Sequence, residues 1–175
     1  VTSDDAVLKN VTLRACDVRS YKNRFFYMNK TGNVANVSFS GLMVNNMGTG
    51  GDFIDIRKGT ANVISVKNST FANGIRTFAR VDAAVVCGAM TVENNTFYNL
   101  CSPDSKDVNG ILHVRSTSLS AANFIVKNNI FASMHKAEAE PTQTNGYPKL
   151  VSTNAASQIP TFIGNIFYDV EDVDP

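Results

Sequence analysis

The sequence contains no tryptophan and only 5 prolines, and charged residues make up only 18% of its 175 residues. Its 16 Lys and Arg nearly balance its 15 Asp and Glu, and the resulting net charge of +1 argues against a nucleic-acid-binding protein. No apolar run approaches the roughly 20 residues that a membrane-spanning helix needs. With 43% hydrophobic residues, the chain is expected to form one folded domain over residues 1–175.

Several chemical signatures are also absent. Cys16, Cys87 and Cys101 do not have the spacing of a metal site, and an odd number of cysteines cannot pair completely in disulfides. We therefore expect them to be small buried side chains. The sequence contains no glycine-rich phosphate loop, Ser-His-Asp order or Cys-His metal signature. It starts at Val1, without a start methionine or signal peptide, so we expect a segment of a longer, processed protein.

Asparagine is abundant, with 20 residues, and several asparagines recur within a repeated phrase. Each copy alternates apolar and polar residues up to an Asn or Gly and then continues with β-forming residues, which predicts a strand, a tight corner and a second strand. The copies are Ala6–Leu13, Val37–Val44, Ile64–Phe71, Met90–Phe97, Phe124–Phe131 and Pro160–Phe167. Their corner residues are Asn10, Gly41, Asn68, Asn94, Asn128 and Gly164, which are residue types that tolerate positive φ.

A third β-forming segment lies in each gap between copies. The central apolar residues of these segments are Met28, Ile56, Val81, Val114 and Val151. From each centre to the last residue of the next copy the separation is nearly constant, whereas the other part of the repeat varies in length. A strand must return in register on every coil, but a loop that points away from the stack can lengthen. The pattern therefore predicts an all-β fold, a parallel β-helix of about six coils with three short strands per coil.

Two interior features follow from stacking the copies. Their last residues, Leu13, Val44, Phe71, Phe97, Phe131 and Phe167, are expected to form an interior column. Asn68, Asn94 and Asn128 are expected to form a ladder in which each side-chain amide bonds to the next coil.

The repeated phrases resemble the right-handed, single-stranded parallel β-helices of the pectate-lyase-like superfamily from Leu8 to Phe167. In that superfamily the second turn is a tight Asn-bearing corner, which Val66–Phe71 matches. The resemblance implies that the strands around Ile56, Val81 and Val114 form the first sheet, along which carbohydrates usually bind. Thr91–Asn99 and Asn165–Tyr168 also resemble uncharacterised β-helix domains at the C-terminal ends of surface lipoproteins from polysaccharide-degrading gut bacteria.

The enzymes of this superfamily generally have more coils and an N-terminal capping helix, whereas this sequence opens directly into a coil at Ala6. An uncovered solenoid end exposes unpaired strand edges. We therefore expect a neighbouring domain, further coils or a second chain to cover the ends of the solenoid.

Because side chains alternate along a strand, the residues beside the buried centres of the first sheet are expected to point outward together. In register, Asp55 should meet Arg80, and Asp82 should lie between Arg57 and Arg115. One interpretation is a solvated face with cross-coil ion pairs, each worth about 0.2–1 kcal/mol. The other is a site for an acidic or hydroxyl-rich sugar, with Tyr27 or His113 as a stacking partner. The candidate binding residues are Tyr27, Asp55, Arg57, Arg80, Asp82, His113 and Arg115.

The sequence leaves three functions open. The first is polysaccharide or oligosaccharide binding by a secreted, periplasmic or cell-surface bacterial protein. The second is a polysaccharide lyase that cleaves a uronate-containing glycan by β-elimination, with Arg80, His113 or Arg115 as the base. For such a lyase, Asp52, Asp55 and Asp82 are the carboxylates that could hold calcium. The third is a structural spacer or assembly domain. Two long loops, Ser102–Asp107 and His135–Pro141, are expected to lie at the His113 end of the face.

Overall fold

A computed structural model of the chain describes residues 3–47, 52–74, 77–100, 110–134 and 150–170. Cys101 and the loops Ser102–Asp107 and His135–Pro141 lie outside the described residues. The described residues form no helix that is both long and apolar enough to cross a membrane.

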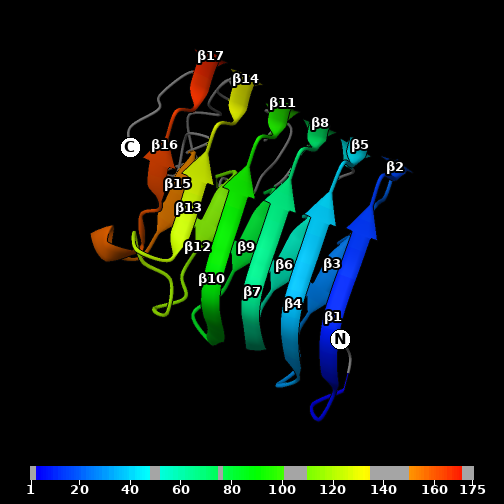
Figure 1. Cartoon of the computed structure of the whole chain (residues 1–175), viewed down its shortest axis with the longest axis vertical. Helices are drawn as coiled ribbons and strands as arrows, with labels where there is room; N and C mark the ends of the chain where they lie inside the picture. The colour runs from blue at the N-terminus through cyan, green and yellow to red at the C-terminus, as the bar shows by residue number, and fades with distance from the viewer. Residues whose placement is uncertain (1–2, 48–51, 75–76, 101–109, 135–149, 171–175) are drawn as a thin grey trace, which may run out of the picture.

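The chain forms a right-handed parallel β-helix of about six coils with three sheets, as the repeats predict (Figure 1). Sheet A, nearest the viewer, contains β1 (Val7–Arg14), β4 (Asn33–Ser40), β7 (Gly59–Lys67), β10 (Val85–Glu93), β13 (Phe124–Lys127) and β16 (Thr161–Ile163). Sheet B contains β2 (Asp17–Arg19), β5 (Met43–Met47), β8 (Thr70–Gly74), β11 (Thr96–Leu100), β14 (Ile130–Met134) and β17 (Ile166–Val170). Sheet C contains β3 (Phe26–Met28), β6 (Ile54–Ile56), β9 (Ala79–Val81), β12 (Leu112–Val114) and β15 (Val151–Thr153). A 3-10 helix, η1 (Ala156–Gln158), precedes β16.

The corners between sheets A and B follow the predicted positive-φ rule in five of the six copies. Gly41, Asn68, Asn94, Asn128 and Gly164 all have φ between 50° and 62°. In the first coil the corner is Ala15, with φ of 51°, so the prediction of Asn10 as a corner is wrong. Asn10 lies inside β1 instead, in register with Asn36 of β4.

The first copy is therefore displaced along the sequence. Leu13 is in register with Phe39 rather than with the last residue of the second copy. The residue beneath Val44 is Val18, not Leu13, and it lies 26 residues before Val44, the same interval that separates Phe71 from Phe97. The alignment of the copies on Asn failed here because Ala15 has a positive φ, which its residue type does not predict.

The segment around Val151 is also displaced, by two residues. Val151 pairs in register with Leu112, and Thr153 is the residue opposite Val114. A shift of two residues keeps the same face of a strand, so alternation alone could not detect it.

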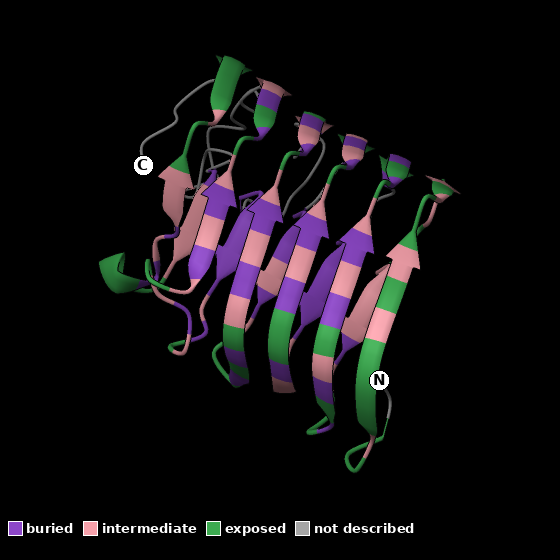
Figure 2. Ribbon diagram, viewed as in Figure 1, coloured by how far each residue is buried: buried purple, intermediate pink, exposed green. Residues whose placement is uncertain are grey.

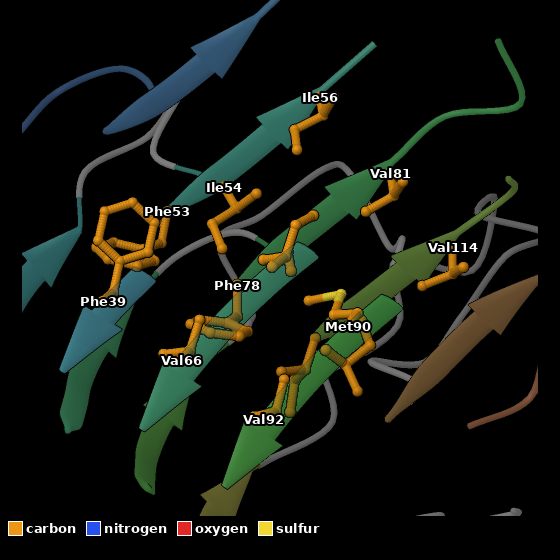
Figure 3. Packing of buried hydrophobic residues seen from close by; sticks show 14 of the residues in the cluster. Phe39, Phe53, Ile54, Ile56, Val66, Phe78, Val81, Met90, Val92 and Val114 are labelled. Carbon is orange, nitrogen blue, oxygen red and sulfur yellow. The ribbon is translucent and has the colours of Figure 1, made fainter. Parts of the chain in front are cut away.

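The core contains two columns of phenylalanine rings. In the predicted column, Phe71, Phe97, Phe131 and Phe167 stack in order, with centroid distances of 5.4, 4.9 and 5.3 Å. A second column, Phe25, Phe53 and Phe78, comes from the segments before sheet C and stacks at 4.9 and 5.7 Å. Its rings meet the first column edge-on, as between Phe78 and Phe97 at 4.8 Å. Figure 2 shows the buried residues concentrated in the middle coils, and Figure 3 shows Phe39 packed against Phe53 between the sheets.

The predicted asparagine ladder is present in part, and a second, buried ladder lies one residue further along. Asn94 does donate to Asn68, at 3.3 Å, but this contact is exposed. The buried ladder uses Asn95, Asn129 and Asn165. The side-chain oxygen of Asn129 accepts from both the backbone and the side-chain nitrogen of Asn95, at 2.9 and 3.1 Å. Asn165 does the same for Asn129, at 2.9 and 3.0 Å. The ladder therefore satisfies polar groups inside the corner that water cannot reach.

Candidate functional site on the outer face of sheet C

The outer face of sheet C carries the residues that alternate with its buried centres. Met28, Ile56, Val81 and Val114 are fully buried, and the last three point into the core in Figure 3. The intervening residues form one row in register, which is Tyr27, Asp55, Arg80, His113 and Ser152. The predicted alignment of Asp55 with Arg80 is therefore confirmed. We call this row and its flanking charged residues the sheet C face.

Asp55 is the centre of the charge network on this face. Its side chain has no exposed surface, yet it pairs with Arg24 and with Arg57, whose Nε lies 3.1 Å from both carboxylate oxygens. Arg80 approaches the same carboxylate at 4.0 Å. The hydrogen bond to Asp55 is the main cause of a raised pKa at Arg57. A buried carboxylate is tolerated here because several guanidinium groups compensate its charge.

Arg24 is a member of the face that sequence reasoning missed. It lies before β3, where the alternation of strand residues does not apply, so no strand pattern marks it. Its guanidinium carbon lies 4.6 Å from the centre of the Tyr27 ring, a cation–π arrangement. Tyr27 is thus held in place by the same arginine that pairs with Asp55.

Ion pairs on the face occur within one strand segment as well as between coils. Arg80 binds Asp82 at 2.9 Å, two residues further along, just as Arg57 binds Asp55. The predicted cross-coil pairs are present in part: Arg80 approaches Asp55 at 4.0 Å, and Arg24 pairs with Asp55 from the preceding coil. Residues two apart share a face at about 6.6 Å, which a long arginine side chain bridges easily.

His113 and Arg115 occupy the C-terminal part of the face. His113 is in register with Arg80 but only 1% exposed, so the expectation that its ring would lie on an accessible surface is wrong. Arg115 is partly exposed, and its backbone is fixed at both ends. Its N–H donates to Val81, and its carbonyl accepts from the side chain of Gln158 at 2.9 Å.

The three proposed calcium ligands are not brought together. Asp52 precedes β6 and is 1% exposed. The burial of Tyr21 raises the pKa of its hydroxyl, and the charge of Asp52 raises it further. Asp55 is occupied by arginines, and Asp82 is paired with Arg80. Across the described parts of the chain, no group of three or more His, Cys, Asp and Glu side chains could hold a metal ion. These residues therefore do not fit a calcium site.

Comparison with known proteins gives one match. Residues 1–74 match a family described as a domain of unknown function (DUF4957). This segment spans the first two coils and the first two strands of the third, so it contains Arg24, Asp55 and Arg57 but not Arg80 or His113. No curated protein and no solved structure matches the chain.

The charge balance indicates what the face can do. Arg24, Arg57, Arg80 and Arg115 outnumber Asp55 and Asp82 by two, and the first three arginines keep 19–30% of their side chains exposed. Each guanidinium has five N–H donors, more than its carboxylate partner can accept. The face therefore offers oriented donors to carboxylate or hydroxyl oxygens of a ligand.

Proposed function

We propose that the chain is a carbohydrate-binding β-helix module of a secreted, periplasmic or cell-surface bacterial protein, and that the sheet C face binds the glycan. The observation that supports this proposal is the row of arginines that the buried carboxylate of Asp55 and its neighbour Asp82 hold in place. Donors that are already oriented lose little side-chain entropy when a ligand binds.

The spacing of the donors suits an extended ligand. Arg80 lies in β9, and Arg57 and Arg115 directly follow the neighbouring strands β6 and β12. Successive strands lie about 4.8 Å apart, so the donors repeat along the solenoid axis. A polymer with oxygens along its length can contact several of them at once, which favours a polysaccharide or oligosaccharide over a compact small molecule.

Binding accounts for the geometry better than β-elimination does. A catalytic base must reach the substrate proton in a form that can accept it. Arg80 is held by Asp82, and His113 is buried, so two of the three candidate bases are poorly placed for that role. The same contacts leave the donor function of the arginines intact.

A glycan array that includes uronate-containing and neutral oligosaccharides tests the proposal, followed by titration of the best ligand. We expect Arg57→Gln and Arg80→Gln each to weaken binding by about tenfold, the equivalent of roughly 1.4 kcal/mol. Arg19→Gln is the matched control, because Arg19 is an exposed arginine on sheet B that also pairs with an aspartate two residues away. If no glycan binds, or if the three variants bind alike, the proposal is wrong and the spacer function becomes the better account.

A further inference from the structure

The two ends of sheet A differ in a way that bears on what the molecule binds. At the C-terminal end the strands shorten, from 9 residues in β10 to 4 in β13 and 3 in β16. At the N-terminal end they do not, because the terminal strand β1 has 8 residues, as many as β4. Proteins usually protect a sheet edge by making the last strand very short. In sheet A the terminal strand β16 is shortened in this way, and the terminal strand β1 is not.

The apolar residues of β1 are also covered on one side only. Leu8 is in register with Val34, which is fully buried, yet Leu8 itself is 41% exposed. Val11 and Leu13 are partly exposed, whereas their partners Val37 and Phe39 in β4 are buried. Figure 2 shows this difference as green and pink segments along β1 beside purple segments along β4. The edge of the first coil thus exposes apolar residues whose register partners in the second coil lie inside the core.

Hydrogen bonds between exposed asparagine side chains also point towards the N-terminal end of the solenoid. The side-chain amide of Asn36 donates to the side-chain oxygen of Asn10 at 2.9 Å. On sheet B, Asn73 donates to Asn45 and Asn99 donates to Asn73, both at 2.9 Å, so each amide donates towards the N-terminal end of the solenoid. Asn10 is the terminal member of its ladder, and its side-chain oxygen accepts from Asn36, so an acceptor beyond β1 would continue the ladder by accepting from the Asn10 amide.

We propose that the edge formed by β1, β2 and β3 binds a further parallel β-helical coil. That coil would cover Leu8, Val11 and Leu13 with its own inward apolar residues. It would also place an oxygen acceptor, as in Asn, Asp or Ser, opposite Asn10. The contact continues the coil-to-coil interface that already joins β1 to β4, and it does not depend on glycan binding at the sheet C face.

The test extends the full chain by one coil. In one variant a copy of residues 59–84 stands directly before Ala6, in place of residues 1–5. Val85, which follows residue 84, is in register with Gly59, and Val7 is in register with Asn33 and through it with Thr60. The copy therefore enters β1 in the same register in which the native residues enter β10. A second variant with a copy of residues 33–58 at the same place keeps the test open if the first does not fold.

Amide hydrogen exchange is measured on the parent and extended chains. We expect exchange in β1 to slow by about tenfold or more in the extended chain, while exchange in β10 stays unchanged. The control is the same extension with Ile64→Asn and Val66→Asn in the copy, which removes two inward apolar residues. Equal exchange rates in β1 with and without the apolar residues would overturn the proposal. If β1 is already protected in a parent chain whose mass by light scattering is at least twice 19.0 kDa, the occupant is a second copy and the assignment of a further coil is wrong.

Discussion

The interior of the corner between sheets A and B and the outer face of sheet C are built in opposite ways. In the corner the contacts run between coils, from Phe97 to Phe131 and from Asn95 to Asn129. On the face the contacts are between charges, and they run within a coil, as between Arg80 and Asp82, as well as between coils, as between Arg24 and Asp55. The corner therefore sets the stacking of the solenoid, and the face can vary in its chemistry without changing the fold.

The difference follows from burial. Inside the corner, water is excluded and the same position recurs on each coil, so apolar rings and amides find partners on the coils above and below. On the face, Arg24, Arg57 and Arg80 keep 19–30% of their side chains exposed to water, so a partner two residues away is as good as one on the next coil. Variants in the two regions should accordingly differ in the size of their effects on stability.

The largest effect is expected at Phe97, which stacks between Phe71 and Phe131 and is fully buried. Phe97→Ala should lower the free energy of unfolding by about 3–5 kcal/mol, because it creates a cavity in the middle of the column. Urea denaturation measures the change. Tyr98→Ala is the control, since Tyr98 points outward from the same strand and is 46% exposed, and its effect should be well below 1 kcal/mol. Similar losses in both variants would contradict the division between interior and face.

The next largest effect is expected at Asn129. Its side chain accepts two hydrogen bonds from Asn95 and donates to the carbonyl of Val92 at 3.0 Å. Asn129→Ala leaves these buried groups without partners, at a cost of about 2–3 kcal/mol. The control is Asn36→Ala, which removes one exposed ladder bond and should cost less than about 1 kcal/mol. If thermal unfolding ranks the two variants equally, the buried ladder has no special role.

Sequence reasoning predicted the regular part of this architecture because the regular part has a period. Phe71, Phe97 and Phe131 recur at one position of the phrase, and their stacking follows directly from the fold. The corner in the first coil was not predictable in the same way. Its residue at positive φ is Ala15, an alanine that bonds to Ser40 of the second coil, and not the Asn or Gly that marks the other corners. The predicted bond between Asn68 and Asn94 is present, but the buried ladder one residue further along was not predicted. Its amides must turn inward, and both asparagines of Asn94 and Asn95 fit the pattern equally well.

For the sheet C face, the sequence predicted the register of the strands but not the contacts between their side chains. The alignment of Asp55 with Arg80 depends only on the interval between strands, which is a property of the repeat. Arg24 joins the face from outside any strand, so its position depends on the path of a turn. The burial of His113 is a property of the tertiary structure, because an outward strand position does not determine what lies above it.

A smaller effect is expected at Asp55. Asp55→Asn removes the charge that Arg24 and Arg57 share, and it leaves guanidinium groups that are about 30% exposed and can be hydrated. We expect a loss of about 1–2 kcal/mol, less than the cost of breaking a wholly buried pair. Asp17→Asn, which breaks an exposed pair with Arg19, is the control and should cause no measurable change in chemical denaturation. A loss at Asp55 as large as that at Phe97 would show that the face, too, holds the coils together.

The smallest effect is expected at Glu93, which bridges Lys127 at 2.8 Å and Lys67 at 2.9 Å on the outside of sheet A. The hydrogen bonds from Lys127 and then from Lys67 lower the pKa of Glu93. A lowered carboxyl pKa stabilises the folded state above the ordinary pKa of glutamate, and this contribution is lost as the pH falls through the folded-state value. Both lysines are more than one third exposed, so the contribution should be only about 0.3 kcal/mol and should shrink in high salt. Glu93→Gln should therefore flatten the pH dependence of the melting temperature slightly on the acidic side. A pH profile that does not differ from that of the parent chain would show that even a bridge across three coils adds nothing when it lies in water.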